Sequence, residues 1–323
     1  MVIVLIVVRV FFGDSPLYQD FLKPILEPAF EAIFNQFPPL ENHQENENDR
    51  KNIQKEEDNQ TQNTNEDTEN NKGRNKQKTE EKNKEIDPNC DVPDSKYNQS
   101  WKDLQALHQY LAKIAVKNQN ACKASTFREN LNVEYTGDDQ QYYKNLYGQL
   151  VKFSSPKMAG IFKTFENIKK NKKLNQEEFA EMIVTFIQSI PYVLVLDKTA
   201  KEAKKGGGFA AGYLNENKPY VENIKFGLQS PIEFLYNKKG DCDTRTVLAF
   251  TILKRFGYDV AILNSKSHSM LGLHLPAQGT SLSYQGKKYF FWETTAQNWQ
   301  LGQMPDDHKN DKTWMFALMA KNN

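Results

Sequence analysis

Gly240-Asp241-Cys242-Asp243 is the stretch that decides the fold, because it stands at the start of a strongly patterned helix. Gly240 allows a sharp turn, and Asp241 is a favoured N-cap residue. Apolar residues follow at helical spacing and stop before Gly257: Val247, Leu248, Phe250, Ile252, Leu253 and Phe256. The pattern therefore predicts that Cys242 lies in the first turn of this helix.

That position affects the chemistry of the Cys242 thiol. Free backbone N–H groups and the positive end of the helix dipole stabilise an anion, so a thiol at a helix N-terminus becomes a thiolate more easily. Asp241 and Asp243 oppose this effect, because their charges have the same sign as a thiolate. We therefore expect Cys242 to need a histidine partner. The alternative is a small buried side chain on a core helix.

Five histidines are candidates for that partner. His268 and His274 lie in or beside a predicted strand at 268–275, and they share one face of it because strand side chains alternate. The other three are set aside because they lie in a polar tract, a helical pattern and a charged tail respectively: His43, His108 and His308.

A carboxylate stands where it could orient such a histidine. A predicted strand at 288–295 follows the turn signal Gln285-Gly286 and carries Glu293. Together with a strand near 259–264, these segments predict an antiparallel sheet on which the Cys242 helix packs. Cys242, one of the two histidines and Glu293 would then form a nucleophile, a base and a group that orients the base.

Several ordered motifs resemble bacterial transglutaminase-like proteins, which belong to the papain-like cysteine enzymes. The resemblance covers the chain from Gln188 onward well and the region before it loosely. Besides the Gly-Asp-Cys-Asp run, the motifs are Gln188-Ser189-Ile190-Pro191-Tyr192, Ser230-Pro231-Ile232-Glu233-Phe234-Leu235, Glu293-Thr294-Thr295 and Gly302-Gln303-Met304-Pro305.

The resemblance implies an α+β fold with a papain-like core and a preceding helical region. It implies His268 as the base rather than His274, since the family's histidine precedes a short aliphatic strand that contains a glycine. Glu293 takes the place of an aspartate that is common in the family. Papain-type enzymes also use a glutamine six residues before the cysteine to bind the oxyanion, and here that residue is Tyr236.

The implied activity is acyl transfer by Cys242, His268 and Glu293 on a protein or peptide substrate. We favour hydrolysis, as in a peptidase or amidase, because water is always available. The alternatives are a protein-crosslinking transglutaminase and a non-catalytic peptide-binding or assembly module. We expect no metal or cofactor, because neither a ligand spacing such as Cys-x-x-Cys nor a phosphate-binding glycine loop is present. The net charge of +1 does not favour nucleic acid as a partner.

Composition divides the chain into four parts. Residues 1–14 are apolar but too short for a bilayer, which takes about 20 residues; we interpret them as the remnant of a membrane anchor, the alternative being an apolar strand. Residues 15–40 form an expected amphipathic helix, and residues 41–96 a disordered polar linker. The domain follows at 97–323, with a helical part at 97–200 and a catalytic core at 201–310. An anchor favours an extracytoplasmic (periplasmic) location, with the cytoplasm as the alternative.

Within the domain, a helical pattern is expected around Trp101–Ile114, followed by helices at 139–152, 156–169 and 176–189. Gly206-Gly207-Gly208 is expected to be a surface loop, with the wall of an active-site mouth as the alternative. Two further cysteines either pair with each other or remain free thiols: Cys90 and Cys122.

Overall fold

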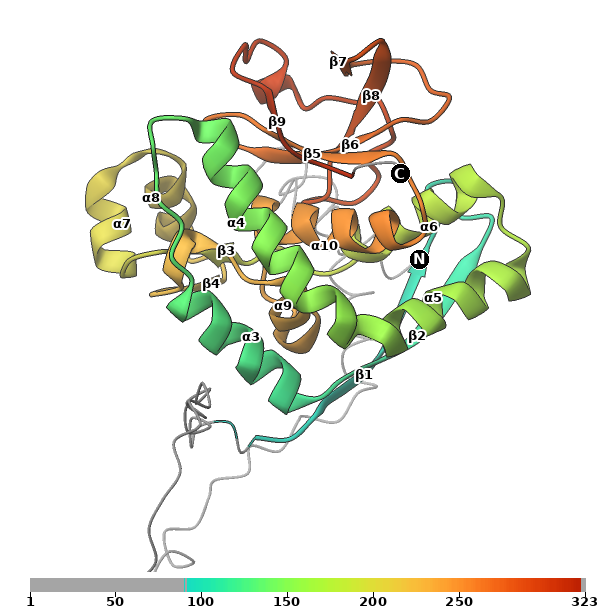
Figure 1. Cartoon of the computed structure of the whole chain (residues 1–323), viewed down its shortest axis with the longest axis horizontal. Coiled ribbons are helices and arrows are strands. Elements are labelled where there is room, and N and C mark those ends of the chain that lie inside the picture. Colours follow the sequence, from blue (N-terminus) through green and yellow to red (C-terminus); the bar gives the residue numbers. More distant parts are fainter. Residues whose placement is uncertain (1–89, 91, 321–323) are drawn as a thin grey trace, which may run out of the picture. The chain divides into compact units, whose positions relative to one another are not determined.

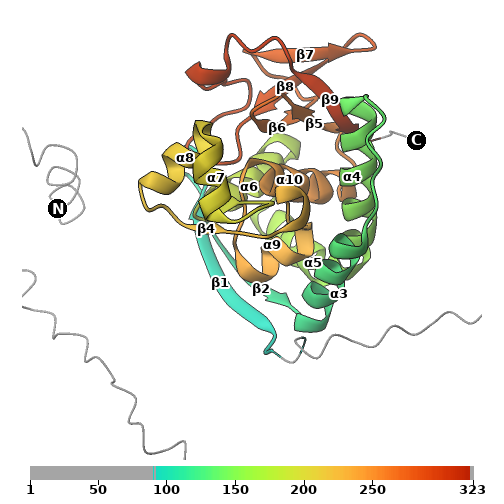
Figure 2. The same cartoon turned by 90° about the vertical axis from the view of Figure 1, so that its left-hand side faces the viewer.

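The computed structural model describes Cys90 and residues 92–320. At its centre lies helix α10 (Cys242–Arg255), which packs on an antiparallel sheet; Figures 1 and 2 both show α10 between this sheet and the short helix α9 (Pro231–Asn237). Val247, Leu248 and Phe250 of α10 have no exposed surface. Full burial of such a side chain contributes about 1.5 to 3 kcal/mol. The predicted helix is confirmed, and its apolar stripe forms the middle of the core.

Five strands form the sheet, and each is antiparallel to its neighbours. Three of them agree with the predicted strands, and two were not predicted. In their order across the sheet they are β7 (Ser281–Tyr284), β8 (Lys287–Trp292), β6 (Ser269–Leu273), β5 (Val260–Asn264) and β9 (Met315–Met319). This combination of helices and an antiparallel sheet is compatible with the predicted α+β class.

The two additional strands extend the sheet at its edges. The predicted turn Gln285-Gly286 joins β7 to β8, with left-handed φ angles of 49° and 78°. At the opposite edge, β9 pairs with β5 and lies beyond residue 310, so the predicted end of the catalytic core was wrong. The burial of β9 does not alternate along the strand. A search for period-2 alternation therefore cannot detect it.

The face of the sheet away from α10 has its own apolar cluster. Most of its residues come from the strands, where they alternate with the residues that face α10, because successive side chains of a strand point to opposite faces of the sheet. Met304, from the segment after β8, packs on this cluster and is 6% exposed. The cluster consists of Ala261, Leu263, Met270, Tyr289, Phe291, Met304 and Phe316.

The three predicted helices before the core are present with slightly different ends. Helix α6 begins at a capping box, in which the side chains of Asn175 and Glu178 each accept the other's backbone N–H. A helix at Asn118–Asn130, α3, was not predicted, because Phe127 is its only large apolar side chain. The other helices are α4 (Asp139–Ser154), α5 (Ala159–Lys172) and α6 (Gln176–Gln188).

The segment around Trp101 is a β-hairpin, so the helical pattern predicted there was wrong. Strand β1 (Ser95–Lys102) pairs antiparallel with β2 (Gln109–Val116). The helical interpretation relied on Leu107 and Leu111, which are 73% and 66% exposed. Every second residue of β2 is buried, but one of these residues is an alanine, which is only weakly apolar. The alternation typical of a strand is therefore hard to see in the sequence. The buried residues are Tyr110, Ala112, Ile114 and Val116.

Several predictions fall on residues outside those that the structure describes. They include the anchor remnant at 1–14, the amphipathic helix at 15–40 and His43. Only the end of the predicted linker at 41–96 is described, and there β1 already begins at Ser95. In the part of the chain that is described, every helix is too short or too polar to cross a membrane.

Gly206, Gly207 and Gly208 join two short helices, so the predicted surface loop was wrong. Helix α7 (Ala200–Gly206) is followed directly by α8 (Gly208–Asn215), and Figure 2 shows this helical hairpin in yellow. Gly207 and Gly208 have φ angles of 73° and 67°, which side chains with a Cβ rarely adopt. A two-stranded parallel pair lies at the base of the hairpin: β3 (Leu194–Val195) and β4 (Tyr220–Val221).

Cys90 and Cys122 form a disulfide, which decides between the two alternatives for these residues. The bond joins the segment before β1 to helix α3. Since the chain contains three cysteines, Cys242 is the one free thiol.

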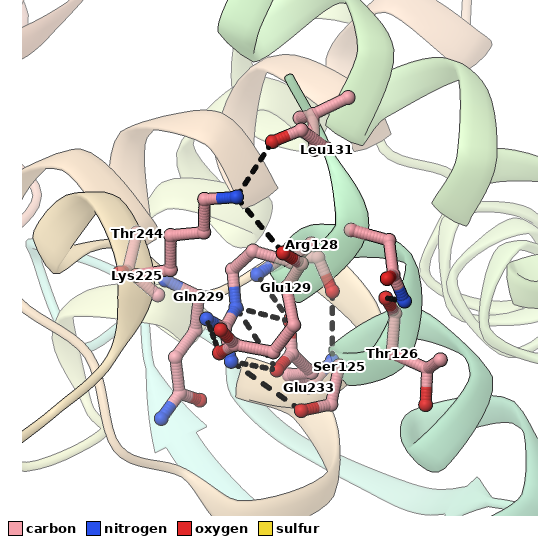
Figure 3. A network of polar contacts seen from close by, with 11 residues as sticks. Ser125, Thr126, Arg128, Glu129, Leu131, Lys225, Gln229, Glu233 and Thr244 are labelled. Atoms are coloured by element: carbon pink, nitrogen blue, oxygen red, sulfur yellow. Dashed lines mark hydrogen bonds and ion pairs between the residues drawn. The ribbon is translucent and has the colours of Figure 1, made fainter. Parts of the chain in front are cut away.

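A buried ion pair joins α3 to α9 (Figure 3). Arg128 Nη2 lies 3.0 Å from Glu233 Oε1, and the two residues are 2% and 6% exposed. Glu233 also accepts the Ser230 N–H at 2.9 Å in the capping box of α9. The Gln229 N–H donates to Thr244 Oγ1 of α10 at 3.2 Å. The Ser-Pro-Ile-Glu motif therefore connects α3 to the helix that carries Cys242.

Replacing Glu233 with alanine removes the buried carboxylate from Arg128 and leaves it the half-exposed Glu129 and the Ser125 hydroxyl, so we expect the free energy of unfolding to fall by about 3 kcal/mol, the lower end for a broken buried pair. The double variant Arg128→Met/Glu233→Leu removes both charges and should recover most of this loss. Urea denaturation followed by circular dichroism measures both effects. Glu166→Ala, which removes an exposed pair with Lys170, is the control and should leave stability unchanged. A double variant no more stable than Glu233→Ala would contradict this account.

Candidate active site

Cys242 is the first residue of α10, and the two residues before it begin the helix. The Asp241 side chain is the N-cap and accepts the Thr244 N–H at 3.4 Å. A Cβ atom on Gly240 would lie 2.7 Å from Thr244 Cγ2 and 2.9 Å from Phe234 Cδ2. Close packing therefore requires a glycine at position 240.

His268 and Glu293 lie at the ends of neighbouring strands, and their side chains meet. His268 directly precedes β6, and Glu293 directly follows β8, to which β6 is antiparallel. His268 Nε2 lies 2.7 Å from Glu293 Oε2, with side-chain exposures of 12% and 3%. The structure thus brings together two of the three predicted site residues. His274, the alternative base, instead contacts the Lys288 carbonyl through Nδ1 at 2.9 Å.

The Glu293 carboxylate is held by hydrogen bonds on both oxygens. Oε1 accepts the backbone N–H groups of Thr294 and Thr295 and the Thr295 hydroxyl, each at 2.8 Å. Burial raises the pKa of Glu293, but the hydrogen bond and charge of His268, together with Thr295, lower it further than burial raises it. The carboxylate is therefore ionised and accepts the Nε2 proton of His268. In the neutral ring, Nδ1 is then the unprotonated nitrogen.

Cys242 is the first residue of α10, which packs beside β6. Its Sγ donates to Asp243 Oδ1 at 3.6 Å, and the backbone N–H of Ser269 acts to lower the pKa of Cys242. Within the described residues, no hydrogen bond joins Cys242 to His268. Catalytic hydrogen bonds are often long before a substrate binds. The structure thus places Cys242 at the start of α10 and His268 directly before the neighbouring strand β6, without a hydrogen bond between their side chains.

Burial, together with acidic neighbours, keeps the thiol neutral. Burial, followed by the charges of Asp243 and Asp241, raises the pKa of Cys242 well above its usual value. Burial also raises the pKa of both carboxyls, and Asp243 adds to the increase at Asp241. The like charges and burial therefore outweigh the expected effect of the helix N-terminus. A thiolate at Cys242 requires a cationic partner.

Arg245 is a buried cation one helical turn after Cys242, and it was not predicted as part of the site. Its side chain has no exposed surface, and burial lowers its pKa to about 10, so it remains charged at neutral pH. Sequence does hold a signal for it, because Arg245 shares a helix face with Leu248 and Ile252. The guanidinium donates at 2.6 to 3.2 Å to four backbone carbonyls, those of Ile187, Ile190, Gly240 and Thr294.

Three further side chains bear on the oxyanion site. The Tyr236 hydroxyl donates to the Pro93 carbonyl at 3.0 Å, so this residue does not replace the glutamine of papain-type enzymes. Gln188 Nε2 donates to the backbone carbonyls of Glu293 at 2.8 Å and Trp299 at 3.1 Å, so it supports the backbone around Glu293. The Tyr192 ring centroid lies 5.8 Å from Arg245 Cζ, and burial, followed by the Cys242 charge, raises the pKa of Tyr192.

Two histidines that were set aside have different surroundings from those predicted. His108 lies after the turn of the β1–β2 hairpin, where its Nδ1 is 2.8 Å from Asp103 Oδ2. His308 belongs to the site: its ring stacks on His268 with a centroid distance of 4.3 Å and an interplanar angle of 1°. The charged residues around His308 in the sequence are typical of an exposed tail, which explains why it was missed.

No family model, curated protein or solved structure matches the chain. The resemblance to transglutaminase-like proteins stays a prediction from the quoted motifs. Among the residues that the structure describes, no three or more His, Cys, Asp and Glu side chains are grouped to bind a metal ion.

Replacing Asp243 with asparagine removes a negative charge beside the sulfur, so we expect the pKa of Cys242 to fall. The rate of alkylation by iodoacetamide, measured against pH, reports the titration of this single free thiol. Its midpoint should move to lower pH, and the rate at neutral pH should rise. Glu134→Gln, a charge removal elsewhere on the domain, is the control. A midpoint that stays in place or moves to higher pH would show that Asp243 does not hold the thiol neutral.

Proposed function

We propose that this protein is a cysteine-dependent acyl-transfer enzyme with a papain-like, transglutaminase-like core. The observation that carries the proposal is the 2.7 Å contact between His268 Nε2 and Glu293 Oε2. It orients an imidazole whose chain neighbour, Ser269, accepts the Thr246 hydroxyl of the Cys242 helix through its carbonyl at 3.3 Å. An ionised carboxylate, an oriented histidine and a free thiol at a helix N-terminus are the parts of a cysteine nucleophile site.

In the proposed reaction, His268 Nδ1 takes the thiol proton and the Cys242 sulfur attacks an amide carbonyl carbon. Glu293 stabilises the imidazolium through Nε2. The Cys242 backbone N–H is the donor that we assign to the tetrahedral oxyanion. The C–N bond then breaks, the leaving amine receives the proton from His268, and a thioester remains on Cys242.

The acceptor of the thioester determines the product. In hydrolysis, His268 deprotonates water, which attacks the thioester carbon and releases a carboxylic acid and the free thiol. In crosslinking, a primary amine attacks instead and forms an amide. We favour hydrolysis, because water needs no dedicated binding site. The neutral resting thiol is compatible with either outcome, since the proton moves only when His268 becomes cationic.

A non-catalytic binding module is the second candidate. The Glu293 carboxylate is ionised, and hydrogen bonds hold both of its oxygens, one of them to His268. A carboxylate with a purely structural role would not need this arrangement, so the contacts of Glu293 favour catalysis. The disulfide between Cys90 and Cys122 favours an oxidising, extracytoplasmic compartment. We propose that residues 1–14 tether the domain there.

Incubation of the full-length protein with a glutamine-containing peptide, with and without a primary amine, tests the proposal. Mass spectrometry should detect deamidated or cleaved peptide and no incorporated amine. Cys242→Ala should abolish turnover, and His268→Ala should lower the rate by about 10²- to 10⁴-fold, the usual contribution of general acid–base catalysis.

His274→Ala removes a histidine outside the site and should leave turnover unchanged. An amide-linked amine product would replace hydrolysis by transamidation as the function. Peptide that binds but is recovered intact, with the same result for Cys242→Ala, would favour the binding module.

A further inference from the structure

His308 covers one face of the His268 ring, and the stack is enclosed by a tryptophan. The two imidazole planes are parallel within 1° at 4.3 Å. Trp314 stands edge-on to both rings, at 6.5 Å from His268 and 6.2 Å from His308, each at 80°. Trp314 itself packs on Phe291 of β8 at 4.9 Å. The contacts with His308 and Trp314 thus fix the plane of the His268 ring.

The segment that carries His308 is attached to the sheet before and after it. The Gly302 N–H donates to the Phe291 carbonyl at 2.7 Å, and the Gly302 carbonyl accepts the Thr280 N–H at 2.8 Å. A Cβ on Gly302 would lie 1.9 Å from the Gln278 carbonyl oxygen, so a glycine is required. After His308, Thr313 Oγ1 accepts the Lys266 N–H at 3.1 Å. The Gly-Gln-Met-Pro motif therefore holds His308 against the site.

Burial and the charge of His268 favour a neutral His308 ring on a cationic His268. Burial and then the His268 charge lower the pKa of His308, while Glu293, Asp307 and Asp311 act in the opposite direction. A neutral aromatic face attracts a cation placed over it. Two imidazolium rings in the same stack would instead repel each other.

We propose that His308 is a positioning residue for His268: the neutral His308 ring stabilises the His268 imidazolium and keeps its Nε2 on Glu293, and protonation of His308 breaks this stack. The inference rests on the proposed role of His268 as the base. The imidazolium forms when Cys242 gives up its proton, so the stack stabilises the thiolate and imidazolium pair. As the pH falls, His308 gains a proton and the pair is lost.

Alkylation of Cys242 by iodoacetamide between acid and neutral pH tests this inference without a substrate. His308→Ala removes the stacked ring and should slow alkylation at neutral pH by roughly two- to tenfold, which corresponds to the energy of an aromatic pair. His308→Phe keeps an aromatic ring that cannot be protonated. At neutral pH it should react within about twofold of the wild-type rate. Because residue 308 can then no longer be protonated, the alkylation rate should fall less steeply with falling pH than in the wild type.

His274→Phe makes the same change at an exposed histidine of the same sheet and should match the wild type, and circular dichroism verifies that each variant is folded. If His268→Ala slows alkylation but both His308 variants match the wild type, the inference is wrong while the proposed function stands. A His308→Phe profile that keeps the steep acid side would assign that proton to another group and refute the pH dependence. If His268→Ala itself changes nothing, the proposed function fails first.

Discussion

The burial of the Arg245 guanidinium is the constraint on which the rest of the site depends. A charged group without exposed surface is costly unless its donors are all satisfied. Here the acceptors are backbone carbonyls from the end of α6, the turn after it, the residue before Asp241 and the residue after Glu293. A single side chain therefore holds α10, which begins at Cys242, to the chain segment that carries Glu293. Its positive charge also offsets part of the negative charge that surrounds the thiol.

The surroundings of Cys242 favour the neutral thiol at rest and the thiolate only beside a cationic imidazole. Asp241, Asp243 and burial all disfavour a negative sulfur. The Glu293 carboxylate, in contrast, forms hydrogen bonds with His268 and with the two threonines that follow it. The thiolate is thus stable only while an adjacent imidazole carries a positive charge. This arrangement also protects the free thiol from oxidation, since oxidants react with the thiolate form.

Local periodicity predicted the parts of this fold whose side chains repeat regularly. The α10 stripe and helices α4 to α6 follow a helical pattern, and the strands beside His268 and Glu293 are short apolar runs, the second of which follows the turn signal Gln285-Gly286. Strand β2 was misread because exposed leucines mimic a helical spacing, and β9 has no alternation at all. Arg245 and His308 were missed for a different reason. Their roles depend on carbonyls and rings that are distant in sequence, and no local pattern carries that information.

The disulfide between Cys90 and Cys122 has a mechanical consequence. In the β1–β2 hairpin, Ser95 is paired with Val116, so the start of β1 lies at the open end of the hairpin. A pull on the chain ahead of Cys90 would otherwise separate the strands one hydrogen bond at a time from that end. Because Cys90 is covalently joined to α3, the force passes into the helix instead. Tension on the N-terminal segment therefore acts on α3 and leaves the hairpin in place against the core.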